Sequence, residues 1–316
     1  MGVRIAGIHH VTAIAGDPQE NVDFYARVLG LRLVKKTVNF DDPGTYHLYY
    51  GDAAGNPGTI MTFFAWPGAT RGTPGTGQVT ATSFAIPEDS LGYWTERLVE
   101  RGVRFGRPER RFDETVLAFA DPDGLALELV ARSGSGAGGV EPWVGSAVPP
   151  EHAIRSVSGV TLSEESEGVT GGLLADFLGF ETIGEGDGGR VRYAAGGGFA
   201  DVLERPGVPM GRIAVGTVHH VAWRAPDEET QRKWREEVAG RGFNVTPILD
   251  RSYFRSIYFR EPGGVLFEIA TDPPGFAVDE DPEHLGESLK LPPWLEGDRD
   301  RIEEVLRPIR LPREKA

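Results

Sequence analysis

Apolar residues recur along the chain with two periods, about two residues and about 3.6 residues, which predict strands and amphipathic helices in a repeating order. The first repeat begins with a predicted strand near Ile8, followed by a helix over residues 20–29 that Gly30 ends. Three strands follow, over residues 31–40, 45–51 and 59–66.

Three more segments of the chain show the same order of one strand, one helix and three strands. The second runs through residues 79–86, a helix at 90–101, and strands at 103–105, 116–119 and 126–130. The third has a strand at 156–162, a helix at 172–178, and strands at 180–183, 190–194 and 199–203. The fourth runs from residue 217 through a helix at 228–240 to strands at 246–249, 256–259 and 265–270.

Two pairs of similar segments indicate that these four units arose by internal duplication. The segment Ile8-His9-His10-Val11 is echoed by Val218-His219-His220-Val221, and residues 121–128 and 261–268 share Pro, Gly and Glu at the same offsets. We therefore predict an α+β fold of four βαβββ repeats. The expected divisions are a first pair of repeats in residues 1–133, a linker at 134–150, a second pair at 151–272, and a tail at 273–316 with a short helix near 299–306.

Composition narrows the chemistry. The chain has no cysteine, which excludes disulfides, thiolate nucleophiles, iron–sulfur clusters and cysteine-bound zinc. Its 33 basic and 47 acidic residues give a net charge of −14, which repels nucleic acids and anionic membranes. No apolar window is long enough to span a bilayer, and the N-terminus lacks the pattern of a signal peptide. We expect a cytoplasmic protein that forms a homo-oligomer and binds neither nucleic acid nor membrane.

Several segments resemble the vicinal oxygen chelate superfamily, which includes glyoxalases and extradiol dioxygenases, and within it the hydroquinone-type ring-cleaving dioxygenases. These segments are Gly7-Ile8-His9-His10-Val11-Thr12, Tyr46-His47-Leu48-Tyr49-Tyr50-Gly51-Asp52, Pro57-Gly58-Thr59, Pro262-Gly263-Gly264-Val265-Leu266-Phe267-Glu268, Gly275-Phe276, Asp279-Glu280-Asp281 and Leu291-Pro292-Pro293. The resemblance covers nearly the whole chain. It implies the fold of that superfamily, in which paired repeats form two open β-half-barrel domains.

In such half-barrels the first and last strands of each repeat offer corners at which side chains converge. The first repeat offers His10 and Thr62, and the fourth offers His220 and Glu268. Two imidazoles and one carboxylate are typical of non-haem Fe(II) oxygenases and leave about three coordination positions open. We therefore predict one Fe(II), with Mn(II) as the alternative, on His10, His220 and Glu268.

The second and third repeats carry no histidine at these corners. Thr80-Ala81-Thr82 and Ser156-Val157-Ser158-Gly159 stand there instead. We therefore expect Glu128, at the end of the second repeat, to be a relic or a surface carboxylate.

Further site residues are expected around the metal. Because side chains alternate along a strand, only one histidine of each pair can face the metal, and the resemblance selects the second. His9 and His219 are then expected on the opposite face, as supporting residues, and His219 is also a candidate proton donor. Thr12 shares the face of His10 and is expected to line the pocket. The resemblance also places Tyr258 and Arg251 in the substrate pocket, as a proton donor and a stabiliser of negative charge. Strand packing and a surface ion pair are the alternative roles of these two residues. His47 is expected to be structural.

These features favour a dioxygenase that uses O2 to open a dihydroxylated aromatic ring, of either the hydroquinone or the catechol type. One alternative is a glyoxalase-like, metal-dependent isomerase or lyase, which usually needs a carboxylate base at the corner held here by Thr62. The other is a resistance protein that sequesters a small molecule without turnover, which would not need a complete ligand set.

Overall fold

The computed structural model describes residues 4–133 and 142–311, whose strands form two eight-stranded sheets. The strands of the first sheet are β1 (Ile8–Ala15), β2 (Arg32–Asn39), β3 (Asp42–Gly51), β4 (Ile60–Ala65), β13 (Val218–Ala225), β14 (Leu249–Asp250), β15 (Arg255–Arg260) and β16 (Leu266–Thr271). Those of the second are β5 (Gln78–Pro87), β6 (Glu109–Arg111), β7 (Glu114–Ala120), β8 (Ala126–Arg132), β9 (Ser156–Glu164), β10 (Glu181–Gly186), β11 (Arg190–Ala195) and β12 (Gly198–Glu204).

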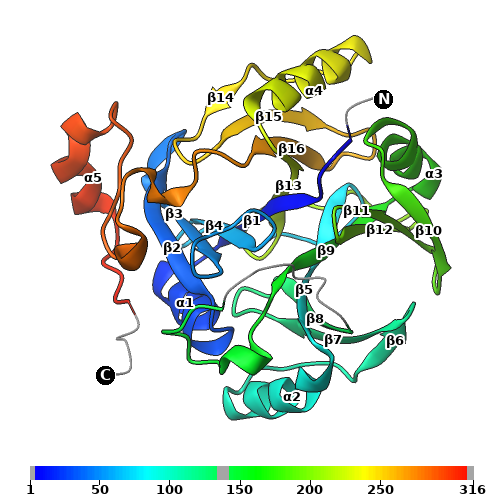
Figure 1. Cartoon of the computed structure of the whole chain (residues 1–316), viewed down its shortest axis with the longest axis horizontal. Coiled ribbons are helices and arrows are strands. Elements are labelled where there is room, and N and C mark those ends of the chain that lie inside the picture. The colour runs from blue at the N-terminus through cyan, green and yellow to red at the C-terminus, as the bar shows by residue number, and fades with distance from the viewer. Residues whose placement is uncertain (1–3, 134–141, 312–316) are drawn as a thin grey trace.

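Helices lie around the sheets, and α2, α3 and α4 mark the outside of the molecule (Figure 1). The helices are α1 (Pro18–Val22) with its continuation η1 (Asp23–Val28), α2 (Leu91–Glu100), α3 (Glu167–Gly172) with η4 (Leu173–Phe177), α4 (Glu228–Gly240) and α5 (Arg299–Val305). Short turns of 3₁₀ helix are η2 (Glu88–Ser90), η3 (Pro150–His152), η5 (Phe276–Val278), η6 (Pro282–His284) and η7 (Glu296–Asp298).

Local signals in the sequence set the helix ends. Asp17 accepts hydrogen bonds from two backbone N–H groups of the first turn of α1, where Pro18 also fits because that position needs no donor. Gly30 ends this helical segment with φ of +74°, a left-handed conformation that favours glycine. Asp227 caps α4 in the same way through the N–H of Thr230.

The predicted βαβββ elements are confirmed except for two short strands. Residues 103–105 make only an isolated bridge from Phe105 to Phe119, and the strand before β7 lies further on, at β6. Of residues 246–249, only Leu249 belongs to a strand, because Pro247 has no N–H to give to a sheet.

Each sheet combines strands from two repeats. The order β14-β15-β16-β13-β1-β4-β3-β2 joins the fourth repeat to the first, and β10-β11-β12-β9-β5-β8-β7-β6 joins the third to the second. Antiparallel pairing of β1 with β13 and of β5 with β9 causes this arrangement. Each open half-barrel sheet therefore contains one repeat from residues 1–133 and one from 151–272. The domain boundaries stay a prediction, and residues 134–141 of the predicted linker lie outside the described residues.

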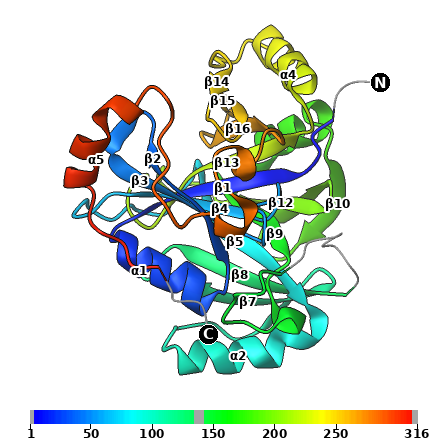
Figure 2. The same cartoon turned by 60° about the vertical axis from the view of Figure 1, so that its left-hand side comes forward.

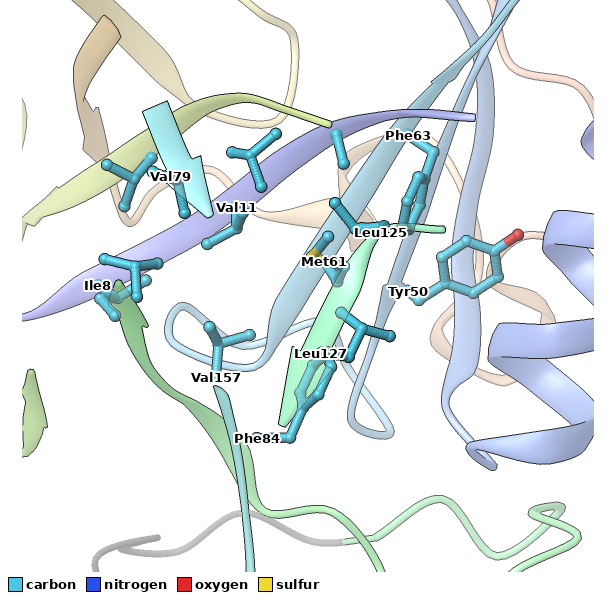
Figure 3. Packing of buried hydrophobic residues seen from close by; sticks show 14 of the residues in the cluster. Ile8, Val11, Tyr50, Met61, Phe63, Val79, Phe84, Leu125, Leu127 and Val157 are labelled. Atoms are coloured by element: carbon cyan, nitrogen blue, oxygen red, sulfur yellow. The ribbon is translucent and has the colours of Figure 1, made fainter. Parts of the chain in front are cut away.

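The main hydrophobic core contains side chains from both sheets. Figure 3 shows its packing, with labels on Ile8, Val11, Tyr50, Met61, Phe63, Val79, Phe84, Leu125, Leu127 and Val157. Val11 and Ala13 of β1 belong to this core. Side chains alternate along a strand, so the intervening residues, His10 and Thr12, face the other side of the first sheet.

The segment after β16 packs on the first sheet, and α5 lies beside β3 (Figure 2). Lys35 of β2 is fully buried, and its Nζ donates to Asp279 Oδ1 at 2.6 Å and Glu280 Oε2 at 2.7 Å. These bonds compensate for burying the Lys35 charge. Among the described residues, no helix combines the length and the apolar character that crossing a membrane requires.

Candidate metal centre

Three side chains converge at the middle of the first sheet. His10 lies on β1, His220 on the neighbouring strand β13, and Glu268 on β16. The register pairs Ala222 with Glu268 and Thr12 with Thr62. Ala222 follows His220 by two residues, and Thr12 follows His10 by two residues. Equivalent register therefore produces the four corners, with Thr62 at the position that corresponds to Glu268.

The donor atoms of these three residues lie within 4.8 Å of one another. Glu268 Oε2 is 2.9 Å from His220 Nε2 and 3.4 Å from His10 Nε2, and the two Nε2 atoms are 3.4 Å apart. All three residues are buried, with exposed fractions of 1%, 4% and 0% for His10, His220 and Glu268. Over residues 4–133 and 142–311 no other group of three or more His, Asp or Glu side chains converges in this way.

Bulges in the pairing of β1 with β13 place His9 and His219 beside the converging histidines. The register shifts between Ile8 and His10 and again opposite His219. His9 Nδ1 then lies 2.9 Å from His10 Nδ1, and His219 Nδ1 lies 2.7 Å from His220 Nδ1. The expectation that His9 and His219 face the opposite side is therefore wrong, because a bulge breaks the alternation and re-aims a side chain.

A chain of hydrogen bonds fixes the proton positions on His9 and His10. The carbonyl of Thr271 can only accept, so His9 Nε2, at 3.1 Å, is its donor. Burial lowers the pKa of His9 to about 3, so the ring is neutral and its Nδ1 accepts from His10 Nδ1. In neutral His10 this leaves a lone pair on Nε2, directed at the shared space. Neutral His220 has the same tautomer if its Nδ1 donates to His219, whose pKa burial also lowers to about 3.

The arrangement fits a cation. Glu268 Oε1 accepts from Ser256 Oγ at 2.5 Å, whereas Oε2 accepts no well-formed hydrogen bond although it is fully buried. Burial alone would raise the pKa of Glu268, but its charge interactions and hydrogen bonds with His10 and His220 hold that pKa well below its usual range. Two imidazole lone pairs and one buried carboxylate oxygen repel each other unless a positive ion lies between them. Nitrogen and oxygen donors of this kind suit Fe(II) and Mn(II).

The fourth corner offers no carboxylate. Thr62 is fully buried, and its hydroxyl contacts Thr12 Oγ1 at 3.0 Å and His47 Nε2 at 2.8 Å. His47 Nδ1 in turn lies 2.8 Å from the Tyr49 hydroxyl. His47 therefore lines the site, a role that sequence reasoning missed. Its position two residues before Tyr49, the strand partner of Thr62, could have placed it on the same face.

A small pocket lies against His10 and His220. It has a volume of about 30 Å³ and is lined by His10, Asn39, Phe40, Asp41, His47, Tyr49, Phe64, His220, Arg251, Phe254 and Tyr258. Arg251 donates to the Tyr258 hydroxyl at 3.3 Å and forms an ion pair with Asp41 at 3.1 Å. Burial and the charge of Glu268 raise the pKa of Tyr258, which keeps its hydroxyl protonated. The pocket thus brings together a neutral hydrogen-bond donor, the Tyr258 hydroxyl, and the positive charge of Arg251.

The second sheet has no comparable site at its equivalent corners. Register places Glu128 and Asp201 there, with Ala81 and Gly159 in place of the two histidines. Arginines occupy the space: Arg111 Nη1 lies 2.8 Å from Glu128, while Arg190 and Arg192 bond Asp201. Glu128 is 6% exposed and pairs with Arg111, so the expectation of a surface carboxylate is wrong, while its alternative, a relic, stays a prediction.

Comparisons with known proteins identify the family to which the chain is similar. The family model of the glyoxalase/bleomycin resistance protein/dioxygenase superfamily matches residues 7–129 and 173–269. The chain is 50% identical to the provisionally named ring-cleaving dioxygenase MhqO of Bacillus subtilis, over 98% of both chains. It is 37% identical to the chlorohydroquinone/hydroquinone 1,2-dioxygenase of Sphingobium indicum, over 95% of both. A solved Bacillus subtilis structure, provisionally described as a dioxygenase, superposes with a TM-score of 0.93 at 48% identity and covers 99% of this chain and 100% of its own.

Proposed function

The chain belongs to the glyoxalase/bleomycin resistance protein/dioxygenase superfamily, and we propose that it is an Fe(II)-dependent dioxygenase that opens a dihydroxylated aromatic ring and inserts both atoms of O2. The observation that carries the proposal is the convergence of His10, His220 and Glu268 beside a fourth corner, Thr62, that offers no carboxylate. The names of relatives that cover nearly the whole chain, MhqO and the hydroquinone 1,2-dioxygenase, support the same class of reaction.

Fe(II) held by these three residues would supply open coordination positions for both reactants and the redox chemistry that activates dioxygen. The chain's own side chains have separate tasks. Tyr258 is kept protonated by its surroundings and donates a hydrogen bond to an oxygen substituent of the ring. Arg251 beside it stabilises negative charge that develops on the substrate. His9 and His219 hold the imidazoles of His10 and His220 in the tautomer that leaves Nε2 free.

The aromatic substrate requires the pocket to open. A cavity of about 30 Å³ has room for roughly one water, whereas one of about 150 Å³ can hold benzene. Phe40 and Asp41, on the turn between β2 and β3, form the outer wall, and the Asp41 side chain is 73% exposed. We propose that this turn moves outward when substrate enters and that the Arg251–Asp41 ion pair then breaks. Arg251 is thereby freed for the substrate.

An isomerase or lyase of the glyoxalase kind is disfavoured because the Thr62 hydroxyl is a poor base and already has two partners, Thr12 and His47. A protein that merely sequesters its ligand would not require three buried metal-binding groups held in fixed tautomers. Neither alternative uses a redox-active metal, which is what the decisive experiment tests.

The experiment is anaerobic reconstitution with Fe(II), Mn(II) or Zn(II), followed by oxygen uptake on a panel of hydroquinones and catechols. We expect one metal ion per chain. Oxygen uptake should occur with Fe(II), and Mn(II) is the alternative metal. Two metals per chain, or full activity with zinc, would overturn the proposal. The panel also separates hydroquinone from catechol substrates.

A cytoplasmic location and a homo-oligomeric state remain proposals that rest on the sequence. Light scattering of the purified protein tests the oligomer, and a single-chain mass in solution would contradict it.

A further inference from the structure

A second and larger cavity lies next to the metal centre, on the side of His9. Its volume is about 570 Å³, and it is bounded by β4, by the loop before β15 and by the segment that follows β16. His9 lies at its inner end, while Ala54 and Ala277 lie at its exposed rim. The cavity therefore reaches from the surface to the residue that supports His10.

One side chain separates this cavity from the substrate pocket. Phe254 lines both of them and is 3% exposed. Its ring centroid lies 5.1 Å from that of His9, which faces the larger cavity, and 5.0 Å from that of His10, which faces the substrate pocket. Phe254 is therefore the side chain that the two spaces share.

The walls of the larger cavity are mostly apolar. Pro57, Ile60, Tyr253, Pro273 and Phe276 supply much of the surface. The two charged groups in the wall, Arg224 and Asp272, bond each other at 2.7 and 2.8 Å. Such walls offer little to a dihydroxylated ring but do not hinder a small apolar molecule.

We propose that this cavity is a second entrance to the metal centre that admits dioxygen past Phe254. The inference rests on the proposed function, in which two reactants must reach one metal. The substrate pocket has room for roughly one water and must open for an aromatic ring, which then occupies that route and leaves the second reactant in need of another. Arg251 and Phe254 also belong to one short loop, in which Arg251 N donates to Phe254 O at 3.0 Å. Substrate bound to Arg251 is therefore coupled, through this loop, to the Phe254 ring that closes the second entrance.

The variants that test this block the route at two points. Ala277→Trp fills the exposed rim far from the metal, and Phe254→Trp enlarges the side chain that lies between the two cavities. Val278→Trp is the matched control, because Val278 is the next residue, is 56% exposed and does not line the cavity. Xenon under pressure in crystals locates apolar space, and nitric oxide serves as a diatomic probe of the Fe(II)-loaded protein under anaerobic conditions with a catechol bound.

We expect xenon in the cavity of the unmodified protein and its loss in Ala277→Trp. Nitric oxide association should slow by about tenfold in both blocking variants and stay unchanged in Val278→Trp, with equal catechol affinity in Ala277→Trp, Val278→Trp and the unmodified protein. Unchanged association in Ala277→Trp, or a cavity without xenon, would overturn the inference. If either result comes from a protein that still consumes oxygen with Fe(II), the inference fails and the proposed function stands. If the protein shows no Fe(II)-dependent oxygen uptake, the proposed function itself is refuted.

Discussion

His219 Nδ1 lies 2.7 Å from His220 Nδ1, on the edge of the His220 ring that is turned away from Glu268. This contact supports the metal-binding tautomer without touching the metal. His219→Phe removes the acceptor and should weaken Fe(II) or Mn(II) binding by about 10- to 100-fold, whereas His219→Asn, which keeps an acceptor near Nδ1, should restore part of the loss. Titration against a competing chelator measures the metal affinity of each variant. His284→Phe, at an exposed histidine, is the control. Equal metal affinity in His219→Phe would show that the contact is only packing.

Thr62→Glu tests whether this corner faces the metal. A carboxylate there should reach the ion as a fourth ligand at about 2.0–2.2 Å. We expect metal binding to be retained or tightened while ring cleavage is lost, since fewer positions stay open for the two reactants. Metal content and oxygen uptake of the same preparation measure both effects. Undiminished oxygen uptake in the metal-loaded variant would mean that residue 62 does not face the metal.

Thr62→Val is the companion variant and has a different expected effect. It removes the hydroxyl that contacts Thr12 and His47, two side chains with little access to solvent. The cost in unfolding free energy should be about 1–3 kcal/mol, with metal still bound. Denaturant unfolding of the metal-loaded protein measures it. Loss of the metal would instead make Thr62 a ligand.

Glu268→Gln and Glu128→Gln compare equivalent corners of the two sheets. Glu268→Gln should abolish metal retention, because the only charged ligand is lost. Glu128→Gln should leave metal content intact and reduce stability by at most about 3–5 kcal/mol, because Arg111 loses its partner. Metal analysis together with denaturant unfolding distinguishes these effects. Equal metal loss in both variants would show that the repeats were assigned wrongly.

Stability should depend on pH through Glu164, at the end of β9. Its side chain is buried, neither carboxylate oxygen has a hydrogen-bond partner in the described part of the chain, and burial with the nearby charge of Glu261 raises its pKa to about 8. An unfolded glutamate titrates at about 4.3, so between that pH and about 8 the folded protein binds more protons than the unfolded one. The free energy of unfolding therefore falls as pH rises through this range.

Glu164→Gln mimics the protonated side chain and should remove that fall. Relative to the unmodified protein in the same metal state, the variant should gain stability between pH 5 and pH 8, as measured by denaturant unfolding. Glu165→Gln, at the exposed neighbouring residue, should show no such gain. A constant difference between Glu164→Gln and the unmodified protein across this range would mean that Glu164 is ionised in the fold.

The sequence predicted the ligand set because duplication leaves a trace. Equivalent His-His pairs in two repeats and a glutamate that ends an apolar strand identified His10, His220 and Glu268, which the structure brings together. The face of His9 could not be predicted, since a bulge leaves no mark in the alternation of apolar residues. His47 was missed because its role depends on Thr62, a residue of a different strand.

The matched histidine pairs indicated that the first and fourth repeats meet at one site, but apolar periodicity alone does not show which strands pair. Apolar periodicity shows which residues of β1 are buried, but not whether β13 or β5 lies beside that strand. The ion pairs of the second sheet were hidden for the same reason, because Arg111 and Glu128 meet only after β7 has placed β6 near β8. Pairings between residues distant in sequence are set by packing of the whole molecule rather than by local patterns.

The most direct test of the central claim is the oxygen content of the product formed under ¹⁸O₂. Fe(II)-loaded protein is given the best hydroquinone or catechol of the panel, and the product is trapped by borohydride reduction before its aldehyde or ketone oxygen exchanges with water. We expect a ring-opened product that carries two ¹⁸O atoms, and no such product from Glu268→Gln. A quinone without ¹⁸O, or a ring-opened product with a single ¹⁸O atom, would contradict it.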